Sequence, residues 1–202
     1  MLLKYIVKNY KSIAHPIEYS MFPTTQNLDH KYLVTLHTVQ GPWKILRRGA
    51  LLGPNASGKS NFIQSLDFAR DYIVEAQKSG TRTGIPQFKG DFSDIGKNST
   101  FQFMFYHNEN VYEYGFTLDD FRVKEEWLMI LGKTTFLPIF QRLTTNEDVT
   151  SIELSHYLGR KNSRKRRLAE LLKETIKKNQ RNQLFLYKLS ENGFSIAESI
   201  VE

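Results

Sequence analysis

Gly53 to Ser60 is the segment whose residue types and spacing could do chemistry, because it fits the pattern G-x-x-x-x-G-K-[ST]. Glycines let the backbone wrap around phosphates with N–H groups pointing inward, and a following helix adds the positive end of its dipole. Lys59 would reach the β and γ phosphates of ATP as the catalytic cation, and Ser60 would place its hydroxyl on Mg²⁺. The predicted phosphate-binding set, here called the glycine-rich loop, is Gly53, Pro54, Asn55, Ala56, Ser57, Gly58, Lys59 and Ser60.

The same residues have a second interpretation, a Gly-Pro-Asn turn that caps an ordinary helix through Ser57 or Ser60. The flanking sequence favours the nucleotide site, because the loop stands between the apolar segment of residues 43–52 and a predicted amphipathic helix. That helix ends near Gly80, and its predicted apolar face consists of Phe62, Ile63, Leu66, Ala69, Ile73 and Val74.

Hydrolysis needs an acidic residue at the end of a buried strand as well as a phosphate cradle. The nearest candidates are Asp119 and Asp120, which follow Gly115-Phe116-Thr117-Leu118. The preceding residues alternate aromatic and polar side chains, as in a half-exposed antiparallel strand. We therefore interpret Asp119 and Asp120 as the end of a hairpin.

The remaining elements follow from hydrophobic periodicity. Short-period patterns predict strands over residues 2–9, 17–21 and 31–39, ahead of the glycine-rich loop. An irregular segment over residues 80–97 should follow the first helix. The second half then reads as a hairpin of residues 100–106 and 111–118, strands over 121–131 and 136–142, a helix over 163–178 and a short apolar segment over 183–189.

Positive charge is concentrated in one segment. The chain has 28 basic and 21 acidic residues, a net charge of +7, and residues 160–181 alone carry ten basic residues against two acidic ones. Such a run can bind the phosphates of nucleic acid, although at the head of an amphipathic helix it is also typical of a solvated surface. The candidate polyanion-binding residues are Arg164, Lys165, Arg166 and Arg167.

Composition excludes several classes of protein. The chain has 202 residues and no cysteine, so disulfide scaffolds, cysteine nucleophiles and thiolate metal sites are ruled out. No apolar run approaches the roughly 18 to 20 residues that span a bilayer, and Lys4 interrupts the apolar start too early for a secretory signal. The five histidines lack metal-ligand spacing. We expect a cytoplasmic protein with no membrane partner.

The segment from Gly53 to Phe62, with Asn61 directly after the serine, resembles the Walker A motif of ABC-type ATPases of the SMC, RecF and OLD group. It is most similar to prokaryotic AAA family ATPases allied to the RloA and AbiL abortive-infection proteins. The resemblance extends to other parts of the chain, namely residues 3–12, 111–116, 126–128 and 182–186.

This resemblance implies an α/β fold: a P-loop NTPase lobe of ABC-ATPase type with an antiparallel β lobe and a C-terminal helical segment. It implies one N-terminal lobe over residues 1–202, divided into 1–80, 81–150 and 151–202. Lys11, Ser12 and Asn61 match positions close to the nucleotide. The implied cofactors are ATP and Mg²⁺, and the implied assembly is a homodimer or another head-to-head pair of ATPase heads.

Members of this group continue with a signature helix, a Walker B Asp-Glu and a switch histidine, all of which this chain lacks before Glu202. We therefore expect the chain to bind ATP and to hydrolyse it only when a C-terminal half is supplied. We also expect a role in anti-phage defence with a toxin or other effector as partner. Two rivals stay open: a small P-loop kinase, and a non-enzymatic module that binds nucleic acid or a partner and has a passive P-loop.

Overall fold

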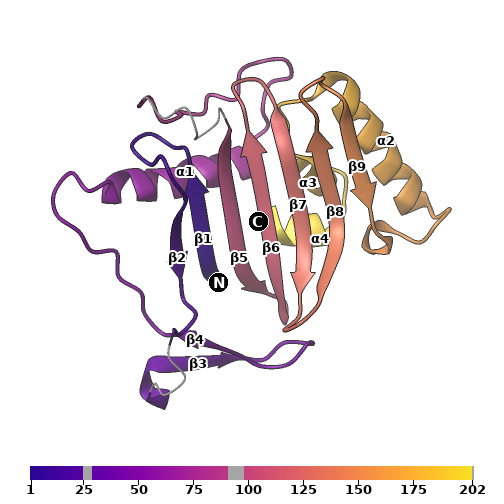
Figure 1. The fold of residues 1–202 in the computed structure, drawn as a ribbon. Helices are drawn as coiled ribbons and strands as arrows, with labels where there is room; N and C mark the ends of the chain where they lie inside the picture. The colour runs from indigo at the N-terminus through magenta and orange to yellow at the C-terminus, as the bar shows by residue number, and fades with distance from the viewer. Residues whose placement is uncertain (25–28, 91–97, 202) are drawn as a thin grey trace.

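A seven-stranded sheet is the framework of the protein in the computed structural model, which describes residues 1–24, 29–90 and 98–201. Every neighbouring pair of strands in it is antiparallel. In spatial order the strands are β2 (Ile17–Ser20), β1 (Leu2–Lys8), β5 (Ser99–His107), β6 (Asn110–Leu118), β7 (Val123–Leu131), β8 (Phe136–Thr144) and β9 (Thr150–Leu154) (Figure 1).

The predicted hairpin is confirmed: β5 and β6 pair along their whole length, from Ser99 opposite Leu118 to His107 opposite Asn110. The strands predicted at residues 2–9, 17–21, 121–131 and 136–142 are also present, with ends shifted by one or two residues. The pattern of residues 150–154 was too short to predict β9. The mixed α/β class with an antiparallel sheet is the fold that we expected.

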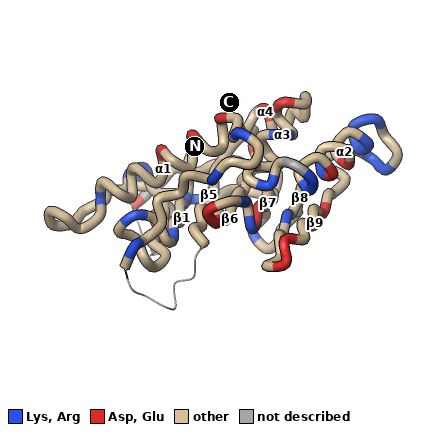
Figure 2. Tube along the Cα trace, turned by 90° about the horizontal axis from the view of Figure 1, so that it is seen from above, with Lys and Arg blue, Asp and Glu red and all other residues tan. Residues whose placement is uncertain are grey.

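Helices cover one face of the sheet (Figures 1 and 2). They are α1 (Lys59–Val74), α2 (Arg164–Asn179), α3 (Phe185–Glu191) and α4 (Ser195–Val201). Their buried side chains form a single core cluster with those of the sheet, in which aromatic rings stand among a larger number of aliphatic side chains. The short apolar segment predicted over residues 183–189 is mostly helical, because it overlaps α3. Helix α4 was not predicted.

Helix α1 ends at Val74, earlier than predicted, and its buried face differs from the predicted one. Phe62 and Ala69 are buried as expected, and Leu66 and Ile73 pack against the core as partly buried side chains. In contrast, Ile63 and Val74 are 51% and 39% exposed. Ser65 and Tyr72 are buried in their place. Periodicity based on aliphatic residues was wrong at Ile63 and Val74 and did not predict Ser65 and Tyr72. Tyr72 stacks on Phe116 of the sheet, and the Ser65 hydroxyl is hydrogen-bonded.

A small second sheet lies at one end of the main sheet (Figure 1). It consists of β3 (Leu33–Leu36) and β4 (Trp43–Leu46), preceded by a 3-10 turn, η1 (His30–Tyr32). The strand predicted over residues 31–39 is thus shorter. The two strands pack on Leu3, Val111 and Leu131 and form a second core cluster with them. Residues 49–54 have no regular structure, so no strand of either sheet leads directly into the glycine-rich loop.

The irregular segment predicted over residues 80–97 is confirmed for residues 81–90, and residues 91–97 lie outside the described part of the chain. Another 3-10 turn, η2 (His156–Leu158), connects β9 to the loop before α2. The helix predicted over residues 163–178 is present as α2, with Ser163 as its N-cap accepting a hydrogen bond from the backbone N–H of Arg166.

A buried polar cluster joins the sheet to the C-terminal helices. Glu126 of β7 accepts hydrogen bonds from the backbone N–H groups of Phe185 and Leu186 at 2.7 and 2.9 Å. Arg142 of β8 lies 3.7 Å from the Glu126 carboxylate, and both side chains are fully buried. Burial raises the pKa of Glu126 and lowers that of Arg142, and the attraction between the two charges opposes both shifts.

The same C-terminal segment also holds the far end of α1. The Tyr72 hydroxyl donates to the backbone oxygen of Asn182 at 2.5 Å. The Asn182 amide donates in turn to the backbone oxygens of Lys78 and Thr81, just beyond the helix. These contacts connect residues more than 100 positions apart, so they fix the direction in which α1 crosses the sheet.

Candidate nucleotide site

The glycine-rich loop lies beyond the β2 edge of the sheet, where α1 begins (Figure 1). Gly58 is the N-cap residue of α1, with φ at +92°, and Ala56 also has a positive φ, +64°. Alternation of left-handed and right-handed residues turns successive backbone N–H groups toward one side and forms an anion-binding concavity. The helix adds its own unpaired first-turn N–H groups at the same point.

Lys59 extends across the loop. Its ammonium group donates to the backbone oxygens of Gly53 and Pro54 at 2.7 and 2.6 Å, and Ser57 Oγ lies 3.4 Å away. These acceptors are neutral, so the loop positions the charge of Lys59 without neutralising it. The ammonium group is therefore placed where it can exchange carbonyl oxygens for the oxygens of a phosphate.

A hollow of about 420 Å³ opens at the start of α1. It contains Ser60, the predicted Mg²⁺ ligand, and no aspartate or glutamate is among the described residues that line it. One lining residue, Ser12, comes from the first part of the chain. The full lining is Ser12, Asn55, Ala56, Ser57, Gly58, Lys59, Ser60 and Asn61.

The turn after β1 brings Lys11 and Ser12 to the helix. Asn61 of α1 donates to Ser12 Oγ at 2.6 Å, whereas the Lys11 ammonium group is directed to Gln64 Oε1 at 2.6 Å. The Tyr10 hydroxyl donates to the backbone oxygen of Gln64 at 3.1 Å. Ser12 thus adjoins the hollow, and Lys11 lies alongside α1.

Tyr10 and Gln64, which hold this turn against α1, were not predicted as part of the site. Gln64 stands three positions after Asn61, so the two side chains lie on neighbouring turns of the same side of α1. Helical spacing after the motif could have suggested Gln64. Tyr10 has no comparable signal, since its contact depends on where β1 ends relative to α1.

Comparison with known families gives a match over residues 50–192, which is more than two thirds of the chain. The matching family is described as "AAA domain, putative AbiEii toxin, Type IV TA system". The chain belongs to this AAA-domain family. The expectation of an AAA family ATPase of the abortive-infection type is confirmed, and the chain carries a nucleotide-binding, ATPase-like module. No curated protein matches it.

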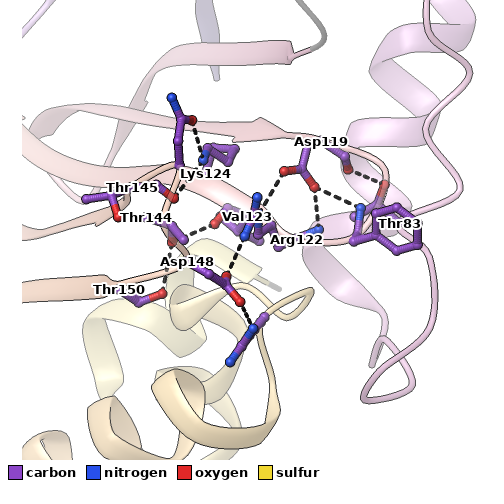
Figure 3. A network of polar contacts seen from close by, with 12 residues as sticks. Thr83, Asp119, Arg122, Val123, Lys124, Thr144, Thr145, Asp148 and Thr150 are labelled. Atoms are coloured by element: carbon purple, nitrogen blue, oxygen red, sulfur yellow. Dashed lines mark hydrogen bonds and ion pairs between the residues drawn. The ribbon is translucent and has the colours of Figure 1, made fainter.

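Asp119 in this AAA domain has a structural role. Its carboxylate accepts from the backbone N–H groups of Phe121 and Arg122 and from the Arg122 side chain (Figure 3). Arg122 also binds Asp148, which pairs with Arg181. The network ties the turn after β6 to the turn before β9 and to the segment after α2. The interpretation of Asp119 and Asp120 as a hairpin end agrees with this geometry.

The four predicted polyanion-binding residues lie at the other side of the AAA domain. Helix α2 packs beside β9, at the sheet edge opposite β2, so the structure does not bring them together with the glycine-rich loop (Figure 1). Arg164, Lys165 and Arg167 are exposed. Arg166 is directed inward, where it donates to the backbone oxygens of Leu154 and Ser155 and pairs with Glu170.

Two negative findings concern the described residues. They contain no cluster of three or more histidine, aspartate or glutamate side chains suited to a metal ion. None of their helices combines the length and the apolar character needed to cross a bilayer.

Proposed function

We propose that the glycine-rich loop binds the triphosphate of ATP together with Mg²⁺. The observation that carries this proposal is the position of Lys59, whose ammonium group is held across the loop by the neutral oxygens of Gly53 and Pro54. The hollow beside it receives the positive end of α1 and is lined by no carboxylate of the described residues. Its electrostatics suit a polyphosphate.

Ser60 is the proposed Mg²⁺ ligand. Ser60 belongs to the first turn of α1 and lines the hollow next to Lys59. Mg²⁺ prefers oxygen ligands and keeps several waters, so one protein hydroxyl combined with phosphate oxygens is a sufficient set. Ser12 and Asn61 would border the same phosphates, and Lys11 would reach them by releasing Gln64.

We propose further that the chain acts as the ATP-binding lobe of an ABC-type ATPase that works by nucleotide-dependent pairing of two heads. Hydrolysis needs a group that orients water and an acidic residue near Mg²⁺. Since no described carboxylate lines the hollow, these groups would come from a complementary surface, such as a signature and Walker B half. The family description supports a role in abortive infection or in a toxin–antitoxin system.

Calorimetric titration with Mg·ATP tests the binding site. Charge-assisted hydrogen bonds contribute about 1.5–3 kcal/mol each, so Lys59→Ala should weaken ATP binding about 10-fold to 100-fold. Lys44→Ala removes an exposed lysine of β4 and is the matched control. Equal ATP affinity in the wild type and Lys59→Ala would overturn the assignment.

Two further measurements test the role of Ser60 in binding Mg²⁺ and the need for a complementary surface in hydrolysis. Ser60→Ala should bind ATP with less dependence on Mg²⁺ than the wild type does. Phosphate release by the chain alone should stay at the level of Lys59→Ala. Turnover that depends on Lys59 without any added partner would contradict the proposed need for a complementary surface.

A further inference from the structure

A basic surface covers the loop before α2 and the first turn of that helix. Figure 2 shows a run of Lys and Arg positions at the end of the molecule next to α2. The surface consists of five exposed side chains: Arg160, Lys161, Arg164, Lys165 and Arg167. Residues 154–169 contain no aspartate or glutamate. We call these five residues the α2 basic surface.

The backbone concentrates these charges. Gly159 and Asn162 have positive φ values, +115° and +68°, so the chain folds back tightly before Ser163 caps the helix. Arg164, Lys165 and Arg167 then lie in the first turn of α2, which has no acidic residue. Cations at the positive end of a helix are unfavourable for the helix itself. Helix stability therefore does not explain the composition of this turn.

Three of the other four basic residues of α2 behave differently. Lys173 pairs with Glu170, Lys177 pairs with Glu174, and Arg166 braces the loop against the end of β9. Within the part of the chain that the structure describes, no carboxylate pairs with any of the five residues of the α2 basic surface. They are exposed charges on a loop that Arg166 holds against the end of β9.

The composition of the surface indicates what it fits. Residues 159–167 contain no apolar side chain, and one exposed apolar side chain, Leu171, lines the same hollow as Lys161 and Arg167. The core of a protein interface is usually more apolar than this. The five cations match a phosphate backbone, which guanidinium groups bind through paired hydrogen bonds. Because the charges extend over a loop and a helical turn, they fit a chain of several phosphates better than a single one.

We propose that the α2 basic surface binds the phosphate backbone of nucleic acid without reading its sequence. This binding is separate from the proposed ATP site, because the two lie at opposite edges of the sheet. Lys59→Ala should therefore bind nucleic acid as the wild type does in the absence of ATP. Failure of one proposal leaves the other standing.

Fluorescence anisotropy with a labelled 30-base-pair DNA duplex, titrated at 50 and 200 mM NaCl, tests the proposal. Each neutralised phosphate contributes about −0.9 to the slope of log K against log salt. With four or five contacts, affinity should fall on the order of 10²-fold over this range. The variant Arg164→Gln/Lys165→Gln/Arg167→Gln should reduce the fall to roughly tenfold, since three of the five contacts are lost.

A matched control removes the same charge elsewhere. Lys173→Gln/Lys177→Gln/Lys188→Gln replaces three lysines that are paired with Glu170, Glu174 and Glu191. This variant should keep the wild-type affinity and salt slope. Equal losses in both triple variants would mean that net charge alone drives binding, and the assigned surface would be wrong.

Two other outcomes would also overturn the proposal. One is undetectable duplex binding at 50 mM NaCl by a wild-type chain whose circular dichroism shows it folded. The other is binding to vesicles of anionic phospholipid that is tighter than binding to the duplex at the same salt concentration. An unlabelled duplex of unrelated sequence should compete equally with the labelled one, and strong preference for one sequence would contradict recognition of the backbone alone.

Discussion

Asn61, in the first turn of α1, donates a hydrogen bond of 2.6 Å to Ser12 Oγ, in the turn after β1. This contact joins the start of α1 to the turn after the first strand across 49 residues of chain. It sets the position of one wall of the hollow, because Ser12 and Asn61 both line it.

Removing this hydrogen bond should weaken ATP binding modestly. Ser12→Ala and Asn61→Ala should each cost about 1 kcal/mol, or roughly fivefold in ATP affinity, because the helix start loses its link to β1. Calorimetry with ATP on both single variants and on the double variant gives the coupling free energy between Ser12 and Asn61. We expect the double variant to lose about as much as either single one. Additive losses would show that the two residues act independently.

Gly58 offers a test of the loop backbone. With φ at +92° it has a conformation that L residues avoid, while an added Cβ would meet only Ser12 Oγ, at 3.4 Å. Gly58→Ala should therefore act through backbone strain of about 1–2 kcal/mol and lower ATP affinity roughly 5-fold to 30-fold.

Gly193→Ala is the matched control for Gly58→Ala. Gly193 has φ at +77°, and an added Cβ would meet nothing within 4 Å. Both variants should unfold at lower urea concentration, and only Gly58→Ala should lose ATP affinity. A Gly58→Ala variant that binds ATP normally would show that the loop does not need its left-handed residue.

Ser65 tests the buried side of α1. The Tyr5 hydroxyl donates to Ser65 Oγ at 2.9 Å, and both residues are fully buried. Ser65→Ala should lower the free energy of unfolding by about 1–3 kcal/mol, because the Tyr5 hydroxyl loses its acceptor. Adding Tyr5→Phe removes that hydroxyl and should restore part of the loss. Urea unfolding curves measure both, and a double variant less stable than Ser65→Ala would contradict this explanation.

Glu126→Gln should reveal a pH dependence of stability. An amide nitrogen would face the backbone N–H of Phe185 or Leu186 and leave a donor unpaired, at a cost of about 1–3 kcal/mol. Because burial raises the pKa of Glu126, the folded wild type binds this proton more tightly than the unfolded chain does. The resulting stabilisation is complete below the unfolded pKa and is lost as the pH rises through the folded pKa.

The difference in free energy of unfolding between the wild type and Glu126→Gln should thus be larger near pH 4.5 than at pH 8. Urea unfolding at both pH values measures it. Glu125→Gln, which changes the neighbouring exposed carboxylate, controls for net charge. A difference that widens toward pH 8 would mean that the contacts of Glu126 with Arg142 and with the two N–H groups outweigh the effect of burial.

Local patterns were enough to predict much of the protein. The spacing of Gly53, Gly58, Lys59 and Ser60 predicts a phosphate-binding loop, because the fit of a backbone turn to phosphates would depend on residues adjacent in the chain. The hairpin of β5 and β6 followed from two alternating runs around a short polar connection, for the same reason. The family match likewise depends on one continuous stretch of sequence, residues 50–192.

Only the tertiary structure decided which distant residues meet. The aliphatic pattern pointed to Ile63 and Val74, yet α1 buries Ser65 and Tyr72 because their hydroxyls find partners on β1 and beside α3. The tertiary structure also distinguishes Arg166 from the exposed cations around it, because the Arg166 guanidinium group donates to backbone oxygens at the end of β9. Such choices depend on hydrogen bonds and packing between residues tens of positions apart, which no local period records.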